Sequence, residues 1–333
     1  MATLITGAAG FVGHATSAAL LARGETVIGL DRLSSYYSVA LKRDRVSDLT
    51  ARFKDAFTFL KVDFADFKAL GEALGGHRIG KVVHMGAQAG VRYSLEEPQA
   101  YVQSNLVGHL NVLELCRRLP TCEHLVYASS SSVYGGNTKL PFSVSDRTDH
   151  PVSLYAATKR ADELISESYA HLYRLPQTGL RFFTVYGPWG RPDMTPWIFT
   201  ESILRGKPIS LFNNGEISRD FTYIDDIVDG VLRCLDHPPP DDGKPKAGGS
   251  RGPHRIYNLG NSRSEPLMRL IEIIESETGR KATVEMKPMQ PGDVKDTFAD
   301  IGEITHELGY RPATTLEVGL PRFIEWFRRY QKV

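Results

Sequence analysis

The segment Gly7-Ala8-Ala9-Gly10-Phe11-Val12-Gly13 decides the fold, because it joins an apolar strand to the start of an amphipathic helix. Its G-x-x-G-x-x-G spacing lies one register away from the dinucleotide fingerprint G-x-G-x-x-G. Small residues let the backbone approach a pyrophosphate, and a helix N-terminus supplies N–H donors and the positive end of a dipole. The alternative is a plain tight turn. We therefore predict a dinucleotide site formed by Gly7, Gly10, Phe11, Val12 and Gly13.

Short apolar runs alternate with helical patterns on both sides of this loop. The expected strands are residues 2–6, 26–30, 57–62, 81–84, 124–128 and 179–182. Amphipathic stretches such as 11–23 and 101–118 lie between them. This alternation builds βαβ units and a parallel sheet with helices on both faces. We expect an α/β fold with a Rossmann-type, doubly wound parallel sheet that binds ligands at the carboxyl ends of its strands.

Two acidic residues follow strands of this sheet. Asp31 ends the second strand, where a carboxylate accepts hydrogen bonds from both hydroxyls of the adenosine ribose. A carboxylate there repels a 2′-phosphate and so favours NAD over NADP, although the neighbouring Arg32 weakens that inference. Asp63 follows the third strand, where it either holds the adenine amino group or caps a helix.

The strand–helix pattern loosens after residue 181, where prolines separate short segments. We expect an NAD-binding Rossmann domain over 1–180, with segments near 218–262 returning to it. Residues 181–333 then form mainly a smaller C-terminal α/β domain that binds the substrate and covers the carboxyl edge of the sheet. The Pro- and Gly-rich stretch 237–253 is expected to be a mobile surface loop, and its composition assigns it no role.

Tyr155 and Lys159 stand four residues apart, which places them on one face of a helix. A phenol with a pKa of about 10 is a poor base at neutral pH. A nearby ammonium stabilises the phenolate and thereby lowers that pKa. Ser130 ends a strand upstream and can relay the proton of a reacting hydroxyl to Tyr155. An exposed Tyr–Lys pair beside a polar Ser turn is the alternative, but together the three residues indicate a catalytic site.

These motifs together resemble the extended short-chain dehydrogenase/reductase superfamily, in its sugar-nucleotide epimerase/dehydratase branch. Residues 219–226 carry a signature of that branch. The chain is more narrowly similar to the UDP-glucuronic acid 4-epimerase family. The segments that carry this similarity are 36–37, 41–43, 87–94, 181–194 and 290–294. The resemblance covers nearly the whole chain. It implies tightly bound NAD+, with Ala87 and Lys159 among the residues that hold it.

Two serines after the catalytic position bear on the reaction that this resemblance implies. Related 4,6-dehydratases have an Asp-Glu pair there and UDP-glucuronate decarboxylases have a Glu, whereas this chain has the neutral Ser131 and Ser132. We therefore expect 4-epimerisation of UDP-glucuronic acid to UDP-galacturonic acid through a transient 4-keto sugar. That intermediate is a β-keto acid, so its carboxylate must be held to prevent loss of carbon dioxide. Ser131, Ser132 and Thr184 are candidates, although Thr184 can also be a buried strand-end hydroxyl.

The resemblance also implies how the nucleotide is held. Arg219 binds the diphosphate, and Gln290 and Asp293 hold the uridine ribose. Arg191 binds either the diphosphate, which we prefer slightly, or the sugar carboxylate. Arg92 faces the gap between cofactor and substrate unless it forms a surface ion pair. Trp189 and Trp197 either wall the sugar pocket or belong to the core.

Composition limits the alternatives. Forty Lys and Arg against 39 Asp and Glu give a net charge of +1, which argues against a broad nucleic-acid-binding face. Three cysteines without Cys or His partners at metal spacing indicate neither a disulfide scaffold nor a metal site. No apolar stretch of about 20 residues is present, so we expect no membrane span and a cytoplasmic location.

The sequence is also compatible with three other functions. UDP-glucose 4-epimerase and UDP-glucuronate decarboxylase share the chemistry of Ser130, Tyr155 and Lys159. A non-catalytic dinucleotide-binding sensor belongs to a different class, and such proteins often lose the Tyr or the Lys. The resemblance further implies a homodimer that pairs the helices near 101–118 and 153–173.

Overall fold

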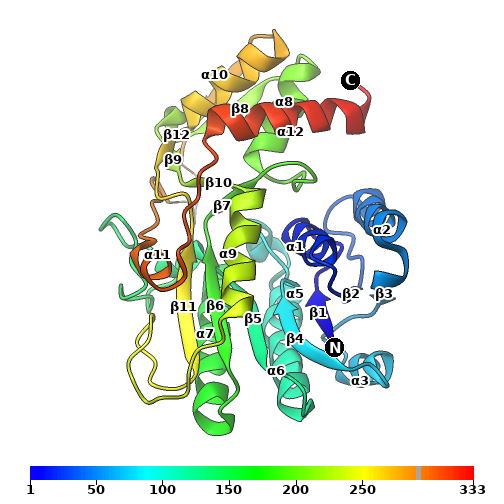
Figure 1. Ribbon diagram of the computed structural model, residues 1–333. Helices are drawn as coiled ribbons and strands as arrows, with labels where there is room; N and C mark the ends of the chain where they lie inside the picture. The colour runs from blue at the N-terminus through cyan, green and yellow to red at the C-terminus, as the bar shows by residue number, and fades with distance from the viewer. Residues whose placement is uncertain (290–293) are drawn as a thin grey trace.

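A computed structural model describes residues 1–289 and 294–333, with a central parallel sheet in the order β11-β6-β5-β4-β1-β2-β3 (Figure 1). Its strands are β1 (Ala2–Thr6), β2 (Val27–Asp31), β3 (Phe57–Lys61), β4 (Ile79–His84), β5 (His124–Ser130), β6 (Gln177–Phe182) and β11 (His254–Leu259). The chain moves outward from β1 to β3 and then returns to pair β4 with β1. Ligands of doubly wound sheets bind where the strand order reverses in this way. The expected Rossmann-type α/β fold is confirmed.

Helices cover both faces of this sheet (Figure 1). One face carries α1 (Phe11–Ala22), α2 (Val39–Phe53), α9 (Ile224–Asp236) and α11 (Gly302–Leu308). The other face carries α3 (Phe67–Leu74), α6 (Gly108–Arg118) and α7 (Leu154–Tyr173). Buried side chains such as Ile227 and Leu113 fill the two interfaces, and each contributes about 1.5–3 kcal/mol by leaving water.

The stretch expected as one helix over 101–118 is divided in the structure. It consists of α5 (Pro98–Tyr101), a π-helical turn η2 (Val102–Val107) and α6; the short α4 (Tyr93–Glu96) precedes it. The widened turn carries Asn105, whose amide bonds the backbone of Gln88 in both directions, at 2.8 and 3.0 Å. The π-turn therefore fixes the segment that follows β4. Periodicity alone does not reveal such a turn.

A smaller α/β unit lies above the carboxyl end of the sheet in Figure 1. Its helices are α8 (Thr195–Leu204), α10 (Leu267–Thr278) and α12 (Leu316–Gln331). Its strand pairs are β7 (Thr184–Tyr186) with β10 (Phe221–Tyr223), β8 (Ile209–Phe212) with β13 (Val284–Lys287), and β9 (Ser218–Arg219) with β12 (Glu265–Pro266). The 3₁₀ turn η4 (Asn213–Gly215) also belongs to this unit, whereas η1 (Lys54–Ala56) precedes β3 and η3 (Ser131–Tyr134) follows β5 of the large sheet. The core of the smaller unit includes Trp197 and Phe327.

The connection 237–253 between α9 and β11 contains no helix or strand. It is attached to the sheet at its far end, where Ile256 N donates to Ala247 O at 3.0 Å and Ala247 is buried. Ser250 Oγ also donates to Glu167 on α7 at 2.8 Å. The loop assignment therefore holds, while its mobility stays a prediction. Strand β11, which follows this loop, is not among the strands expected from the sequence, although it falls within the segments near 218–262 that were expected to return to this domain.

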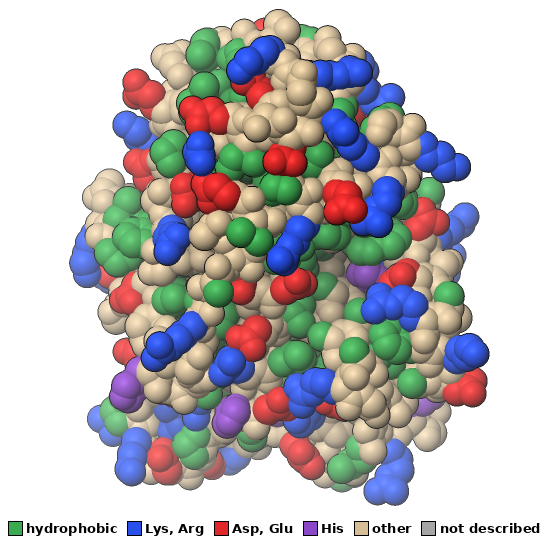
Figure 2. All heavy atoms as spheres, turned by 45° about the horizontal axis from the view of Figure 1, so that its top comes forward, with side chains coloured by type: hydrophobic (Ala, Val, Ile, Leu, Met, Phe, Trp, Pro, Cys, Tyr) green, Lys and Arg blue, Asp and Glu red, His purple; other side chains and the backbone are tan. Residues whose placement is uncertain are grey.

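Acidic and basic side chains are interspersed over the face shown in Figure 2. This even mixture is consistent with the net charge of +1. Within the described ranges 1–289 and 294–333, no helix combines the length and apolar character that a bilayer crossing requires.

Candidate active site

A cavity of about 770 Å³ lies at the carboxyl ends of β1, β2, β4 and β5 and continues to β7, β10 and α8. Its volume falls in the range of about 300–1,000 Å³ that is usual for ligand sites. The predicted site residues that line it are Gly7, Gly10, Phe11, Val12, Gly13, Asp31, Ala87, Arg92, Ser130, Ser131, Ser132, Tyr155, Lys159, Thr184, Arg191 and Arg219. The fold thus brings together residues from the whole length of the chain.

The glycine loop forms one end of this cavity. Gly7 has a φ of +70°, and a Cβ there would lie 2.6 Å from the amide nitrogen of Gly86. A Cβ on Gly13 would collide with the carbonyl oxygen of Gly7. Without these side chains the backbone and the N-terminus of α1 are open to the cavity. Such a cradle fits the pyrophosphate of a dinucleotide.

Asp31 lies beside the glycine loop at the end of β2. Its carboxylate accepts hydrogen bonds from Leu33 N at 2.7 Å and from Ala9 N at 3.2 Å. Burial raises the pKa of Asp31, while these backbone donors and nearby Lys42 oppose the shift. Two carboxylate oxygens have about four lone-pair sites, so acceptor capacity remains for ribose hydroxyls. The geometry therefore fits the adenosine end of a dinucleotide.

Asp63 is not among the described residues that line the cavity. Its carboxylate accepts from Ala65 N at 3.0 Å and pairs with Arg32 at 3.1 Å. The N-cap of α3 is Asp66, so the helix-capping alternative for Asp63 is wrong. The predicted contact of Asp63 with adenine stays a prediction.

Tyr155 and Lys159 line the cavity from α7, and Ser153 caps the N-terminus of this helix by accepting from Ala156 N at 3.1 Å. The Lys159 ammonium donates to Ala128 O at 2.9 Å and to Asp162 at 3.1 Å. These contacts fix the ammonium one helical turn from the phenol. A cation in this position stabilises a phenolate on Tyr155.

Ser130 ends β5 and also lines the cavity. Its hydroxyl donates to Ser132 Oγ at 3.2 Å and accepts from Ser132 N at the same distance. Ser130, Ser131 and Ser132 therefore form a row of neutral hydroxyls that runs from the end of β5 into the η3 turn. Such groups donate hydrogen bonds to an anion without supplying a strong acid.

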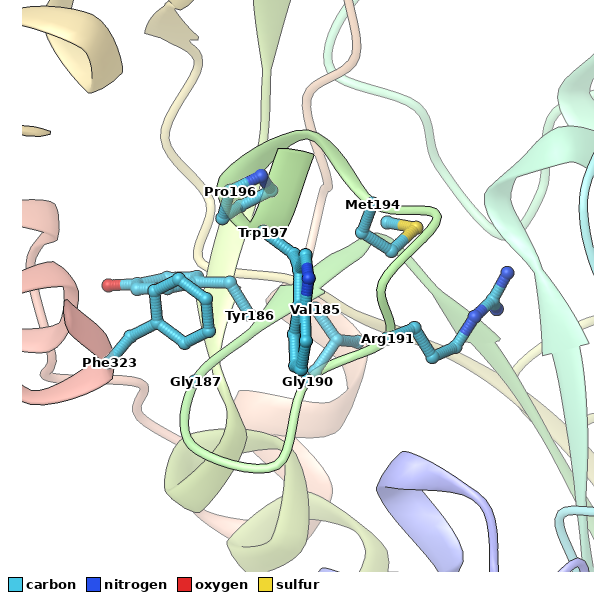
Figure 3. A pocket seen from close by; sticks show the side chains of 9 residues that line it. All are labelled: Val185, Tyr186, Gly187, Gly190, Arg191, Met194, Pro196, Trp197 and Phe323. Atoms are coloured by element: carbon cyan, nitrogen blue, oxygen red, sulfur yellow. The ribbon is translucent and has the colours of Figure 1, made fainter. Parts of the chain in front are cut away.

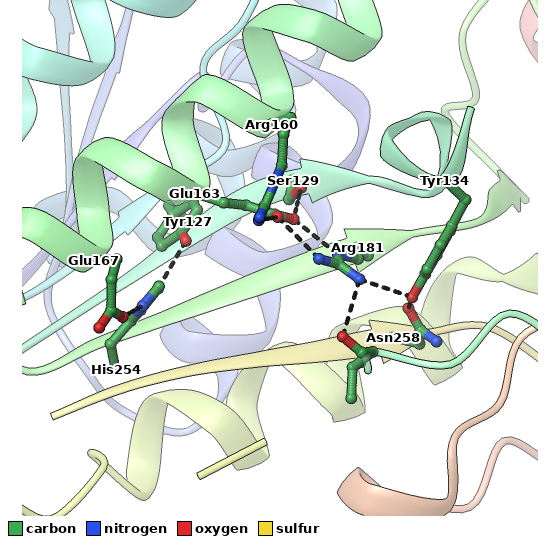
Figure 4. Close-up of polar contacts among 10 residues, drawn as sticks. Tyr127, Ser129, Tyr134, Arg160, Glu163, Glu167, Arg181, His254 and Asn258 are labelled. Atoms are coloured by element: carbon green, nitrogen blue, oxygen red, sulfur yellow. Dashed lines mark hydrogen bonds and ion pairs between the residues drawn. The ribbon is translucent and has the colours of Figure 1, made fainter. Parts of the chain in front are cut away.

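A buried ion pair between Arg181 and Glu163 stabilises the end of β5 (Figure 4). Arg181 on β6 makes two bonds of 2.8 and 2.9 Å to the Glu163 carboxylate. Ser129 Oγ donates to the same carboxylate at 2.7 Å. Burial opposes the ionisation of Glu163, but Arg181 and Ser129 keep its pKa below the usual value. The charge-assisted network locks α7 to the strand that carries Ser130.

Arg191 points away from the aromatic side chains drawn in Figure 3. Those side chains line a void of about 10 Å³, which is at most the size of one water. Trp197 is buried there against Phe327, with ring centroids 5.0 Å apart. Trp189 contacts Trp326 at 5.3 Å. Neither tryptophan lines the large cavity, so the core alternative holds for both.

Of the remaining predicted substrate residues, Thr184, Arg219 and Arg92 line the cavity. Thr184 begins β7, where its backbone amide donates to Asp220 O at 3.1 Å, and the residue lines the cavity. Arg219 Nη1 donates to Lys295 O at 2.8 Å. The Arg92 guanidinium stacks over Phe212 at 4.7 Å. Gln290 and Asp293 lie outside the described residues.

Sequence reasoning missed two groups at this site. Asn105 also donates to Thr158 Oγ1 at 3.0 Å, so it ties the segment after β4 to the helix of Tyr155. Tyr36 and Asp193 both line the cavity and are joined by a hydrogen bond of 3.0 Å. A pair 157 positions apart has no local signal. Within the described ranges, no cluster of His, Cys, Asp or Glu could hold a metal ion.

The chain belongs to the NAD dependent epimerase/dehydratase family, whose sequence profile matches residues 3–260. It is 48% identical to UDP-glucuronate 4-epimerase 4 of Arabidopsis thaliana, over 98% of this chain and 75% of that protein. It is 45% identical to Protein CapI of Staphylococcus aureus, over the whole of both chains.

A solved structure gives the same picture of the fold. The UDP-glucuronic acid 4-epimerase from Bacillus cereus, crystallised with UDP-glucuronic acid and NAD, superposes with a TM-score of 0.87. That chain is 30% identical to this one, and the match covers 99% of this chain and 100% of the other.

Proposed function

We propose that this protein catalyses the NAD-dependent 4-epimerisation of UDP-glucuronate to UDP-galacturonate. The observation that carries the proposal is one cavity lined by the glycine loop, Tyr155, Lys159 and Ser130. Similarity over at least 98% of this chain to proteins named UDP-glucuronate 4-epimerase or UDP-glucuronic acid 4-epimerase supports the substrate. The neutral Ser131 and Ser132 favour epimerisation over elimination or decarboxylation.

Tyr155 is the proposed base and acid of this reaction. It takes the proton of the sugar C4 hydroxyl, which Ser130 orients, and Lys159 stabilises the phenolate that results. The glycine loop and Asp31 would hold NAD+, which would supply the acceptor and later the donor of the C4 hydride, so that rotation of the keto sugar before the return of the hydride would invert C4. Tyr155 then returns the proton to the oxygen, so neither the protein nor the cofactor changes overall.

We assign control of the orientation of the sugar carboxylate to small hydroxyl side chains. Ser131, Ser132 and Thr184 line the cavity from two sides and can donate hydrogen bonds to an anion. The 4-keto intermediate loses carbon dioxide quickly only when its C5–carboxylate bond is parallel to the carbonyl π system. Hydrogen bonds that hold another orientation therefore protect the product.

In this proposal residues 1–180 bind NAD, with Asp63 at the adenine. Residues 181–333 bind most of the UDP sugar. Arg219 binds the diphosphate, and Gln290 and Asp293 hold the uridine ribose. Arg92 lies between the cofactor and the sugar.

We also propose a homodimer formed through α6 and α7. Leu110 on α6 is 41% exposed, and Leu164 and Leu172 on α7 are 55% and 65% exposed. The two helices pack side by side, where Tyr169 donates to Glu114 at 2.7 Å. A second copy would cover these leucines with its own. Light scattering of Leu164→Glu should show a monomer; a dimer unaffected by this change would exclude the interface.

The test of the function is incubation of the purified protein with UDP-glucuronate, followed by NMR without and with added NAD. A UDP-galacturonate anomeric signal without net NADH supports the proposal. A xylose nucleotide or 4-keto pentose as the main product would identify a decarboxylase. Turnover of UDP-glucose alone would identify a different epimerase, and no turnover of either sugar would favour the sensor.

A further inference from the structure

Three side chains join the cofactor side of the cavity to its substrate side. Tyr36 follows β2, and its hydroxyl donates to Asp193 Oδ2 at 3.0 Å. Asp193 in turn accepts from Arg191 Nε at 3.0 Å and from Arg191 Nη2. All three line the cavity, and the arginine and aspartate are only 22% and 27% exposed.

The pairing of Arg191 with Asp193 uses one edge of the Arg191 guanidinium. A guanidinium carries five N–H donors in a fixed fork, so engagement of Nε and Nη2 leaves the edge that carries Nη1. An arginine has long flexible torsions, and a bidentate partner removes most of that freedom. In Figure 3 the Arg191 guanidinium extends away from the aromatic cluster that holds its backbone.

We propose that Asp193 is a positioning and specificity residue, which fixes Arg191 so that its second edge takes two oxygens of the substrate's anionic group. Tyr36 holds Asp193 in place. This inference rests on the proposed function, because it assigns a UDP sugar to the cavity. The anion is either the diphosphate or the sugar carboxylate, since both present a pair of oxygens to a planar fork.

The surroundings favour a fixed rather than a mobile arrangement. Arg45 is fully buried on α2 and donates to Trp189 O at 2.6 Å and Gly190 O at 3.1 Å. It also donates to Ala9 O in the glycine loop at 2.9 Å. The backbone that leads to Arg191 is therefore tied to the cofactor cradle. Tyr36 packs against Tyr93, with ring centroids 4.7 Å apart.

Electrostatics alone gives Asp193 the opposite role. A carboxylate beside Arg191 lowers the net positive charge that an incoming anion meets. If Asp193 only masked the charge, its removal would tighten anion binding. If it positions the fork, its removal weakens binding even though the net charge becomes more favourable. The sign of the change therefore separates the two roles.

The experiment compares Asp193→Asn and Tyr36→Phe with the wild type. Calorimetry measures the Kd of UDP, UDP-glucuronate and NAD, and steady-state kinetics separates KM from kcat. The matched control is Asp149→Asn, because Arg147 and Asp149 repeat the spacing of Arg191 and Asp193 at an exposed position outside the cavity.

The expected result is a rise of about tenfold in the UDP-glucuronate Kd for Asp193→Asn and about threefold for Tyr36→Phe, with NAD binding unchanged. An equal loss for UDP identifies the diphosphate as the anion, and a loss confined to UDP-glucuronate identifies the carboxylate. Unchanged or tighter binding, or an equal effect of Asp149→Asn, overturns the inference. Tyr36→Phe decides alone if Asp193→Asn does not fold.

Failure of the proposed function gives a different pattern. A wild-type protein that binds UDP and UDP-glucuronate but converts neither UDP-glucuronate nor UDP-glucose refutes the epimerase proposal. The Kd comparison still tests Asp193, because it does not require turnover.

Discussion

Lys159 Nζ lies 3.1 Å from Asp162 Oδ2, and both side chains are buried. Asp162 Oδ1 has no hydrogen-bond partner among the described residues. Burial raises the pKa of Asp162 to about 7, although the Lys159 charge opposes the shift. When this carboxyl is ionised, it offsets part of the positive field that Lys159 exerts on the Tyr155 phenol. The charge of Asp162 therefore couples the proposed base to pH.

We predict that Asp162→Asn leaves kcat nearly unchanged at low pH and changes how kcat varies as the pH rises. Asparagine resembles the protonated acid, so at pH 6 the variant and the wild type should turn over at similar rates. At pH 8 the wild type carries the extra negative charge and should be slower by about threefold, or about 0.65 kcal/mol. Steady-state kinetics from pH 6 to pH 9 measures the difference. Parallel profiles would exclude this coupling.

Removal of the Tyr155 hydroxyl should separate binding from chemistry. Tyr155→Phe keeps the ring against Tyr101, 6.0 Å away, so NAD and UDP-glucuronate should bind normally. Loss of the proton acceptor should lower kcat by about 10²–10⁴-fold. Tyr173→Phe, at the exposed end of the same helix, is the control and should leave kcat unchanged. Near-normal turnover of Tyr155→Phe would remove this residue from the mechanism.

Asp31→Asn should weaken the binding of NAD without weakening the binding of NADP. The amide retains the size of the carboxyl but loses a charged acceptor for the ribose hydroxyls, which costs about tenfold in NAD affinity. The same change removes repulsion toward a 2′-phosphate, so the NADP affinity should stay equal or rise. Calorimetry with both cofactors gives the ratio. Equal losses of NAD and NADP would refute the ribose contact.

Asp63→Asn is the informative comparison for that experiment. If Asp63 holds the adenine amino group, the affinities for NAD and for NADP should both fall in Asp63→Asn, because both cofactors carry adenine. If its bonds to Ala65 and Arg32 are its whole role, both affinities should stay unchanged.

Local patterns predicted every strand of the described sheet except β11, because each of the others is a short apolar run next to a helix signal. Expected strands 57–62 and 124–128 match β3 and β5 within two residues at each end. The glycine loop and the Tyr155–Lys159 pair are also local signals. The Tyr36–Asp193 bond and the Arg45 contacts join distant segments, so no sequence period encodes them. Asn105 was missed because a π-turn leaves the apolar periodicity of its neighbours nearly intact.

Two buried histidines should make the fold sensitive to acid. Burial lowers the pKa of His84 to about 3 and the pKa of His109 well below its usual range. Below pH 6.5 the unfolded chain takes up protons that the folded chain does not. The free energy of unfolding should therefore fall from pH 6.5 downward, by about 2 kcal/mol at pH 5 for His84 alone.

Urea denaturation at pH 7.5 and pH 5 measures this loss, and His84→Asn provides the comparison. The variant should be less stable at pH 7.5, because the bond of 2.6 Å between His84 and Thr6 is lost. Its further loss between the two pH values should be smaller than that of the wild type by about 2 kcal/mol. An identical pH dependence would show that His84 is not the titrating group.

Thr184→Val tests control of the carboxylate, because valine keeps the shape of threonine and replaces only the hydroxyl, by a methyl group. The backbone bond from Thr184 N to Asp220 O at 3.1 Å is unaffected, so β7 should stay in place. If the hydroxyl restrains the substrate carboxylate, its loss lets the C5–carboxylate bond become parallel to the ketone π system. Pentose nucleotides should then rise severalfold relative to UDP-galacturonate in an NMR product assay, with NAD binding unchanged. Ser131→Ala and Ser132→Ala should shift the ratio in the same direction, whereas Thr50→Val, at an exposed position on α2, should not. A product ratio equal to that of the wild type in Thr184→Val would assign the restraint to the two serines or to Arg191.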